Sequence, residues 1–228
     1  MKKLISVCGP AHSGTTLLAT MIGSHPNIHL IPKETYWFSE EWWAYGDIRG
    51  AYDYLNSSIK QEYVLEKTPA HVRYVGKILE NFPDSKIIVS LRDPRDIVWS
   101  MYKRHQDWSF SVDQTMIDFM EAEKLKTNKN VKIIRYEDVV NDTRQTVTEI
   151  SEHVGVNFND RMINHHKFSP TWFENVGGDH EKHRALQVKK PLYDGSNQYI
   201  GNLDKNQLNQ IKNKIEKFSE NFGYRITV

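Results

Sequence analysis

The sequence predicts an α/β protein in which a central parallel sheet is flanked by helices on both faces, forming three layers. Short apolar runs rich in β-branched residues alternate along the chain with segments of helical periodicity. The run at residues 86–91 is almost continuously apolar, as a parallel strand buried on both faces should be. The first run leads at once into a loop of small residues and then a helix, an order typical of anion-binding α/β proteins.

The expected elements follow one another in regular alternation. Strands are expected at residues 4–8, 28–31, 63–65, 86–91 and 131–136. Helices are expected at residues 15–24, 69–81, 94–104, 112–126, 143–154 and 204–222. Pro94 stands in the first turn of its helix, and Asp142 or Thr143 and Asp204 are candidate N-caps. This alternation favours a parallel sheet covered on both faces.

Two long segments interrupt this pattern. Residues 35–58 carry eight aromatic side chains among acidic ones, and residues 169–202 mix Gly, Lys, His and Asn with little periodicity. Loops of this length in a compact domain are usually functional or without fixed structure. We therefore expect one domain over residues 1–228, with an aromatic insert at 35–58 and a loop at 169–202 that closes over a ligand.

The composition is that of a globular protein and excludes several classes of partner. Of the 228 residues, 39% are hydrophobic and 26% are charged, and the net charge of +1 gives no general attraction to nucleic acid. The single cysteine, Cys8, cannot form an internal disulfide and is expected to be a small buried residue. No apolar run is long enough for a membrane span, and the first apolar run is too short for a signal peptide. The expectation is a cytoplasmic protein, or a soluble one whose targeting segment lies outside this sequence.

The loop at residues 9–16, Gly-Pro-Ala-His-Ser-Gly-Thr-Thr, is the strongest functional signal. Backbone N–H groups of such a loop, together with the positive end of the following helix, bind an anion. The spacing from Gly9 to Gly14 is that of a P-loop, but Thr15 stands where the lysine that handles a triphosphate is expected. The sequence therefore predicts a P-loop-like fold whose ligand carries phosphate but is not a nucleoside triphosphate.

A second anion site is expected at the end of the 86–91 strand. Arg92 follows this strand, Ser100 lies eight positions later on the next helix, and Arg104 is one turn beyond Ser100 on the same face. A planar guanidinium, a hydroxyl and a further charge suit phosphate binding, and strand ends of this kind share the edge that carries the first loop. The alternative is a structural arginine that pairs with Asp93 or Asp96.

These two motifs, in this order and at this spacing, resemble those of the sulfotransferases that use 3′-phosphoadenosine 5′-phosphosulfate (PAPS). The resemblance runs from residue 3 to about residue 156 and includes Tyr-Glu-Asp at residues 136–138. It implies that the first loop holds the 5′-phosphosulfate and that Arg92 and Ser100 hold the 3′-phosphate. The residues assigned to the donor in this way are His12, Ser13, Gly14, Thr15, Thr16, Arg92, Ser100, Arg104 and Tyr136.

Within that family the chain resembles the bacterial-type and protein-tyrosine branch. Residues 24–28 and 32–35 match its His-Pro and downstream glutamate, which makes Glu34 the general base that takes the acceptor proton. Residues 66–69 match an element whose lysine, here Lys67, contacts the transferring group. Lys190 is expected to reach the 3′-phosphate. Ser196 is expected to contact the sulfate, with Asn197 as the competing register.

His12 departs from the family, which usually has lysine or arginine at this position to stabilise the leaving oxygen. Histidine can do so as imidazolium or as a neutral hydrogen-bond donor. The departure leaves a non-catalytic nucleotide-binding module as an alternative, and a P-loop small-molecule kinase is a further one. Each of the two catalytic candidates also has a non-catalytic alternative. Glu34 is then a solvated loop acid or a partner of Lys33, and Lys67 is a surface lysine.

The expected reaction is transfer of a sulfuryl group to an acceptor hydroxyl, without a metal. The aromatic insert favours a carbohydrate or glycoconjugate acceptor, because flat rings suit sugars, and a peptide tyrosine or small phenol is second. The alternative for the insert is a lid that packs on the core. The histidines at 165, 166, 180 and 183 lack convincing metal-ligand spacing and are expected at the surface or in loops.

Overall fold

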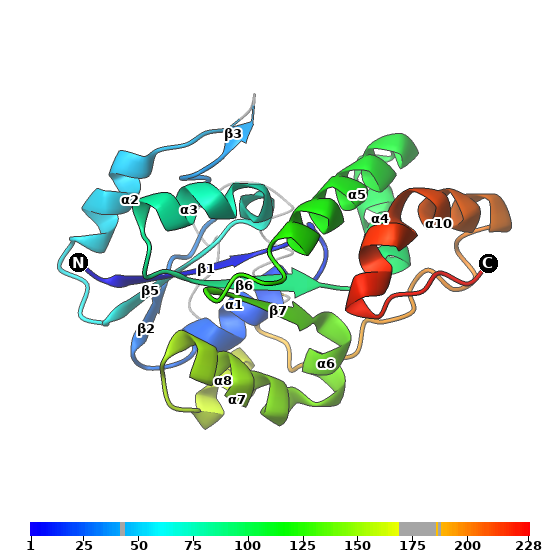
Figure 1. The fold of residues 1–228 in the computed structure, drawn as a ribbon. Coiled ribbons are helices and arrows are strands. Elements are labelled where there is room, and N and C mark those ends of the chain that lie inside the picture. Colours follow the sequence, from blue (N-terminus) through cyan, green and yellow to red (C-terminus); the bar gives the residue numbers. More distant parts are fainter. Residues whose placement is uncertain (42–43, 169–185, 187) are drawn as a thin grey trace.

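The computed structural model contains a five-stranded sheet in which every pairing is parallel, as the sequence predicts. It describes residues 1–41, 44–168, 186 and 188–228. The strand order is β2-β5-β1-β6-β7. Their bounds are β1 Lys3–Cys8, β2 Ile28–Leu30, β5 Tyr63–Lys67, β6 Lys86–Leu91 and β7 Val131–Arg135. The first strand therefore lies at the centre of the sheet, between strands that come much later in the chain (Figure 1).

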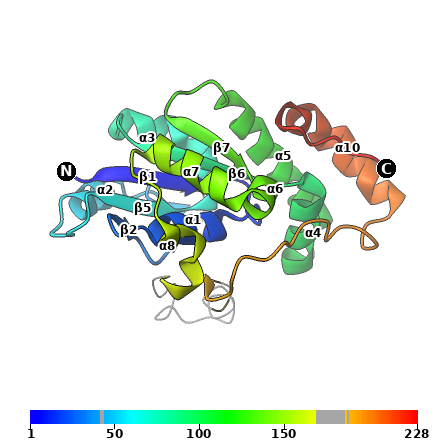
Figure 2. The same cartoon turned by 90° about the horizontal axis from the view of Figure 1, so that it is seen from below.

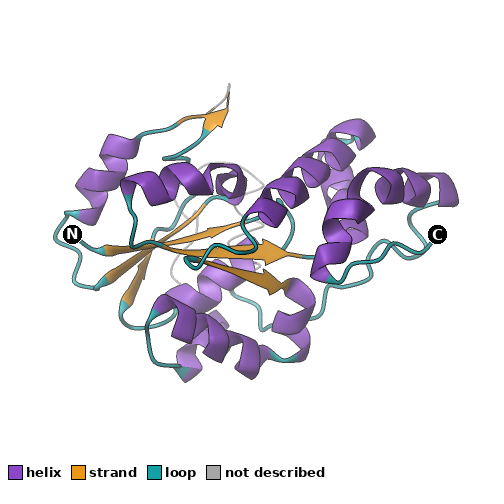
Figure 3. Ribbon diagram, in the orientation of Figure 1, coloured by secondary structure: helices purple, strands orange, loops and turns teal. Residues whose placement is uncertain are grey.

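Helices cover both faces of this sheet, which confirms the three-layer architecture (Figures 1 and 3). Alternate residues of the central strand serve the two faces, since Ile5 and Val7 belong to one buried cluster while Leu4 and Cys8 belong to the other. The face seen from below in Figure 2 is covered by α1 Thr15–Gly23, α7 Thr143–Val154 and α8 Asp160–Ile163. The opposite cluster includes α3 Val75–Asn81, α4 Pro94–His105, α5 Trp108–Lys124 and α10 Lys205–Ser219.

The expected helices form close to their predicted bounds. A 3₁₀ turn, η1 Pro69–Tyr74, makes up the first half of the predicted helix at 69–81, and η3 Glu220–Phe222 ends the last one. Asp204 caps α10 through a reciprocal capping box with Gln207, whereas Asp142 occupies the N-cap position of α7 without a side-chain bond. Cys8 is fully buried, as expected, and burial raises the pKa of its thiol well above the usual value.

The aromatic insert contains regular structure that the sequence reading left unassigned. The two short strands β3 Glu40–Glu41 and β4 Ala44–Tyr45 pair antiparallel, and α2 Ile48–Leu55 follows with Asp47 as its N-cap. Trp37 and Phe38 are buried in the core, and the Tyr54 ring packs against Trp37 at a tilt, with ring centroids 5.6 Å apart. The expectation of an aromatic acceptor platform is therefore wrong for these three rings, because hydrophobic burial commits them to packing. Trp42 and Trp43 lie outside the described residues.

Further short helices follow strand β7 and helix α7. They are α6 Tyr136–Asn141, which begins at the residue after β7, and the 3₁₀ turn η2 His165–Lys167. Residues 169–185 and 187 of the expected closing loop lie outside the described part of the chain. No helix in the described ranges is long and apolar enough to cross a membrane.

Candidate active site

Residues that follow the carboxyl ends of all five parallel strands meet at one edge of the sheet. The loop from Gly9 to Gly14 follows β1, Lys67 ends β5, and Arg92 follows β6. Glu34 comes shortly after β2, and Tyr136 comes directly after β7. A cavity of about 590 Å³ opens at this edge. Ligand sites of parallel sheets lie beyond this end of the strands.

The loop after β1 has the geometry of an anion cradle. Gly9 and Gly14 have φ of 135° and 96°, and His12 between them has φ of 71°, a left-handed value that non-glycine residues rarely adopt. Helix α1 has no side-chain cap and no acidic residue in its first turn, so its first N–H groups have no side-chain acceptor there. The Ser13 hydroxyl is buried and has no hydrogen-bond partner within the described residues. These donors suit a phosphate or sulfate group.

Most of the sequence-predicted site residues line this one cavity. Three do not, namely the buried Ser13 and Lys67 and the half-buried Ser196. Those that line the cavity are His12, Gly14, Thr15, Thr16, Glu34, Arg92, Ser100, Arg104, Tyr136 and Lys190. The structure therefore brings together the two predicted anion sites, which lie nearly eighty positions apart in the sequence.

Arg92 pairs with Asp96, as the structural alternative expects, and also lines the cavity where phosphate binding is expected. Its guanidinium forms an ion pair with the buried Asp96, at 3.1 Å from Nη2 to Oδ2, and also donates to the backbone carbonyls of His12 and Gly195. It stacks on the Tyr136 ring at 4.9 Å from the centroid, and its Nε is buried without a partner among the described residues. The arginine is thus held rigidly, with one N–H still to be satisfied.

Glu34 is paired with Lys67 rather than with Lys33 or solvent. The Lys67 Nζ lies 2.5 Å from Glu34 Oε1, and the Tyr36 hydroxyl donates to Glu34 Oε2. Lys67 is fully buried, so the surface-lysine alternative is wrong, and in this structure its ammonium contacts Glu34. Tyr36 has a left-handed φ of 52°, a strained backbone of the kind that gathers at functional sites.

A buried carboxylate supports this pair from behind. Glu66 is fully buried and accepts hydrogen bonds from the hydroxyls of Ser6 and Thr35. His71 Nδ1 lies 3.0 Å from Glu66 Oε1, while its Nε2 accepts the backbone N–H of Phe38, so Nδ1 carries the proton. These contacts join β1, β5 and the Glu34 segment, which fixes where Glu34 lies. The sequence reading missed Glu66 because a carboxylate within a strand gives no local signal of its partners.

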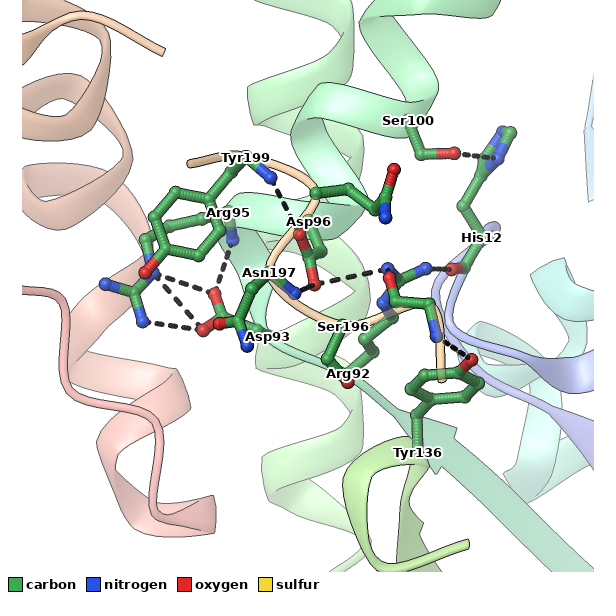
Figure 4. Close-up of polar contacts among 12 residues, drawn as sticks. His12, Arg92, Asp93, Arg95, Asp96, Ser100, Tyr136, Ser196, Asn197 and Tyr199 are labelled. Carbon is green, nitrogen blue, oxygen red and sulfur yellow. Dashed lines mark hydrogen bonds and ion pairs between the residues drawn. The ribbon is translucent and has the colours of Figure 1, made fainter. Parts of the chain in front are cut away.

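His12 contacts a residue of the second anion site. Its Nδ1 lies 2.9 Å from the Ser100 hydroxyl on α4 (Figure 4). The imidazole therefore bridges from the first loop to the helix that carries Ser100 and Arg104. Both ends of this bridge line the cavity.

The segment around Ser196 is bound to the same group of residues. Gly195 donates its backbone N–H to the Tyr136 hydroxyl at 3.0 Å, and that hydroxyl donates to the carbonyl of Tyr193 at 3.2 Å. Burial raises the pKa of Tyr136. Hydrogen bonds from the Ser196 hydroxyl and N–H lower the pKa of Asp194, so the Ser196 side chain is directed to Asp194 in this structure.

The cavity also contains residues that the sequence reading rejected or missed. His165 is 1% exposed and lines the cavity, so the expectation of a surface residue is wrong for it, and burial lowers its pKa. Lys103 and Gln198 line the cavity as well. Lys103 precedes Arg104, and this adjacency was the one available signal. Within the described residues no cluster of His, Cys, Asp and Glu could hold a metal ion, and His180 and His183 lie outside them.

Comparison with known proteins identifies the class. The sequence model of the sulfotransferase family matches residues 40–160. A putative protein-tyrosine sulfotransferase of Caenorhabditis briggsae is 23% identical over 84% of this chain and 78% of its own. The sulfotransferase domain of the Synechococcus PCC 7002 olefin synthase superposes with a TM-score of 0.65 at 19% identity, covering 100% of this chain and 96% of that domain. Mouse sulfotransferase SULT7A1, solved with PAP, gives 0.64 at 19% identity, covering 96% and 84%.

The family match spans more than half of the chain, and the solved structures share its fold over nearly all of it. The chain belongs to the sulfotransferase family and is a sulfotransferase enzyme.

Proposed function

We propose that the enzyme transfers the sulfuryl group of PAPS to an acceptor hydroxyl, with Glu34 as the general base. The observation that carries the proposal is the single cavity that holds the loop after β1, the Arg92, Ser100 and Arg104 cluster, and Glu34. The two anion sites match a donor that has a phosphosulfate at one end and a phosphate at the other. The carboxylate serves the acceptor hydroxyl. A nucleoside triphosphate has no group for the second site.

The residues present fit such a donor. The buried Ser13 hydroxyl and the Arg92 Nε are polar groups left without partners in the described chain. The uncapped N-terminus of α1 adds backbone donors, and Arg104, Lys103 and Lys190 supply positive charge around the cavity.

The chemistry is a displacement at sulfur, in which the bond to the phosphate oxygen breaks as the bond to the acceptor oxygen forms. Glu34 takes the acceptor proton, because it is the one carboxylate among the described residues that line the cavity. Lys67 and Tyr36 hold its two oxygens, so the carboxylate is oriented before the acceptor arrives. Loop N–H groups and His12 stabilise charge on the departing phosphate.

For the acceptor, we infer a phenolic hydroxyl, such as a tyrosine side chain or a small phenol, ahead of the carbohydrate that the sequence favoured. The burial of Trp37 and Phe38 removes rings that would have stacked on a sugar. The chain's own Tyr36 hydroxyl donates to Glu34 Oε2, which supports a phenolic hydroxyl as a partner of this carboxylate. The Caenorhabditis briggsae relative bears a tyrosine-sulfotransferase name. This acceptor class therefore has support from both the site and the comparison.

Titration calorimetry with adenosine 3′,5′-bisphosphate (PAP), 5′-AMP, ATP and GTP tests the donor. PAP should bind most tightly, because charge-assisted contacts to the 3′-phosphate contribute about 1.5–3 kcal/mol each. Equal affinity for PAP and 5′-AMP would contradict the proposal, and a preference for ATP or GTP would support the kinase alternative.

Turnover with labelled PAPS and a panel of acceptors tests the acceptor. We expect sulfation of tyrosine peptides or phenols and little of sugars. Sulfation of sugars alone would restore the carbohydrate reading. Tight binding of PAP with no turnover on any acceptor would favour the non-catalytic module.

A further inference from the structure

Residues 193–199, here named the strap, run irregularly along helix α4 toward α10 (Figures 1 and 2). Tyr193 and Gly195 of the strap line the proposed nucleotide cavity. Ser196 is the middle residue of the strap. Because the strap forms neither a helix nor a strand, its position depends on a few polar contacts.

Asp96, the third residue of α4, makes the central contacts to the strap. Its carboxylate is fully buried and accepts the backbone N–H of Asn197 at 2.8 Å on Oδ2 and that of Tyr199 at 3.0 Å on Oδ1 (Figure 4). Arg92 donates to Oδ2 as well, at 3.1 Å. A buried carboxylate is tolerated only with such donors, and the N-terminal turn of α4 adds a favourable dipole.

The Arg92 guanidinium links Asp96 to the cavity. The Nη2 group that contacts Asp96 also donates to the carbonyl of Gly195, whose N–H donates to the Tyr136 hydroxyl. Asp96, the strap and the two residues expected to bind the nucleotide therefore form one connected network. Asn197 in the strap has a left-handed φ of 62°, a conformation that asparagine adopts more readily than most residues.

The strap has a second attachment to α4, at Arg95. The Tyr199 ring stacks on the Arg95 guanidinium at 4.3 Å, and Arg95 pairs with Asp93 at 2.6 Å. This attachment holds the end of the strap but does not reach Arg92 or the cavity, since neither Arg95 nor Tyr199 lines it. The contacts of Asp96 are thus the ones that join the strap to the nucleotide site.

We propose that Asp96 is a positioning residue, which acts through Arg92 and the strap to couple nucleotide binding to the placement of Ser196. This inference rests on the proposed use of PAPS. The carboxylate orients Arg92 for a phosphate and at the same time holds the backbone that follows Ser196, at Asn197 and Tyr199. A loosened strap would therefore weaken nucleotide binding and displace Ser196 together.

Asp96→Asn tests this role, because an amide offers one acceptor oxygen in place of two and turns an NH₂ group toward existing donors. We expect the dissociation constant for PAP to rise about tenfold to a hundredfold. In the absence of nucleotide, hydrogen–deuterium exchange at the N–H groups of Asn197 and Tyr199 should be faster in this variant than in the wild type. Asp96→Glu, which keeps the negative charge, should restore part of the PAP affinity and part of the protection of the strap from exchange.

Asp118→Asn is the matched control. Asp118 is another buried carboxylate, paired with Arg73 at 2.7 Å on α5, away from the strap. The Asp118→Asn variant should be less stable than the wild type, while its PAP affinity and strap exchange remain as in the wild type. If Asp96→Asn fails to fold, Tyr199→Leu removes the ring contact with Arg95 and loosens the end of the strap, where the Tyr199 N–H donates to Asp96. This variant should therefore speed strap exchange and raise the PAP dissociation constant.

The outcomes separate this inference from the proposed function. Wild-type PAP affinity and wild-type strap exchange in Asp96→Asn would overturn the positioning role. Failure of the wild-type enzyme to bind PAP would instead overturn the proposed donor, and the exchange comparison would then decide whether Asp96 holds the strap at all.

Discussion

At the scale of single residues, the pairing of Glu34 with Lys67 predicts that Glu34 matters for both turnover and stability. Glu34→Gln keeps the shape but cannot accept a proton, so turnover should fall on the order of 10²–10⁴-fold. PAP affinity, measured by calorimetry, should change little. The variant should also be less stable by about 3–5 kcal/mol in urea titrations, because the buried Lys67 loses this counter-charge.

The double variant Glu34→Gln with Lys67→Met separates these two effects. It should recover stability, since no ammonium is then left buried beside an amide, but it should not recover turnover. Recovery of turnover in the double variant would show that Glu34 acts as a structural partner of Lys67 and not as the base.

The contact between His12 and Ser100 sets a second expectation. His12→Ala should lower turnover on the order of 10²-fold with a smaller change in PAP affinity, because charge on the leaving oxygen develops mainly in the transition state. Ser100→Ala should mainly weaken PAP binding. Steady-state kinetics and calorimetry on both variants measure the difference. Wild-type turnover in His12→Ala would reduce this position to a loop spacer.

At the scale of elements, the turn from β1 into α1 depends on Gly14. A Cβ on Gly14 would lie 2.8 Å from Tyr136 Cδ2, and its φ of 96° disfavours any side chain. Gly14→Ala should therefore raise the PAP dissociation constant at least tenfold, roughly the effect of losing one charge-assisted hydrogen bond.

Gly76→Ala is the matched control for this element. Gly76 is an exposed helical glycine in α3 with nothing within 4 Å of the added Cβ. Its replacement should stabilise the helix by up to about 1 kcal/mol and leave PAP affinity unchanged. A Gly14→Ala variant that binds PAP like Gly76→Ala would show that the loop tolerates a rearranged turn.

The elements also show how far the sequence could be read. Apolar runs and alternation predicted all five parallel strands, because burial on both faces leaves a strong local pattern. The 35–58 insert could not be predicted, because aromatic residues suit a core and a ligand platform equally and only tertiary packing decides between them. The loop motif and Arg92 were found through spacing. Asp96 was seen only as one possible partner of Arg92, since its contacts to Asn197 and Tyr199 join segments a hundred positions apart.

At the scale of the whole molecule, buried histidines make stability depend on pH. Burial lowers the pKa of His25, His29, His153 and His165 from the usual 6.5. The folded state then binds fewer protons than the unfolded chain as the pH falls below about 6.5, so stability is lost on acidification. The urea concentration at the midpoint of unfolding should therefore decrease as the pH is lowered from about 7.5 to about 5.

His153→Gln should reduce this pH dependence, because the imidazole is half-buried with Nε2 3.2 Å from the Ile87 carbonyl. His105→Gln, at an exposed position, should leave it unchanged. A pH profile that is the same for both variants and the wild type would place the dependence on the carboxylates instead.

The central position of β1 has a consequence for how the protein is made. β1 is synthesised before both of its neighbours in the sheet, β5 and β6, which follow only at residues 63–67 and 86–91. Until both are synthesised, the backbone of β1 presents unpaired hydrogen-bonding groups on both sides, and such edges invite misassembly. The strap comes later still, at residues 193–199, and contributes Gly195 to Arg92 and Tyr136. The loop after β1 is therefore synthesised long before the strap that contacts Arg92 and Tyr136, so the proposed nucleotide site is completed only after residues 193–199 are made.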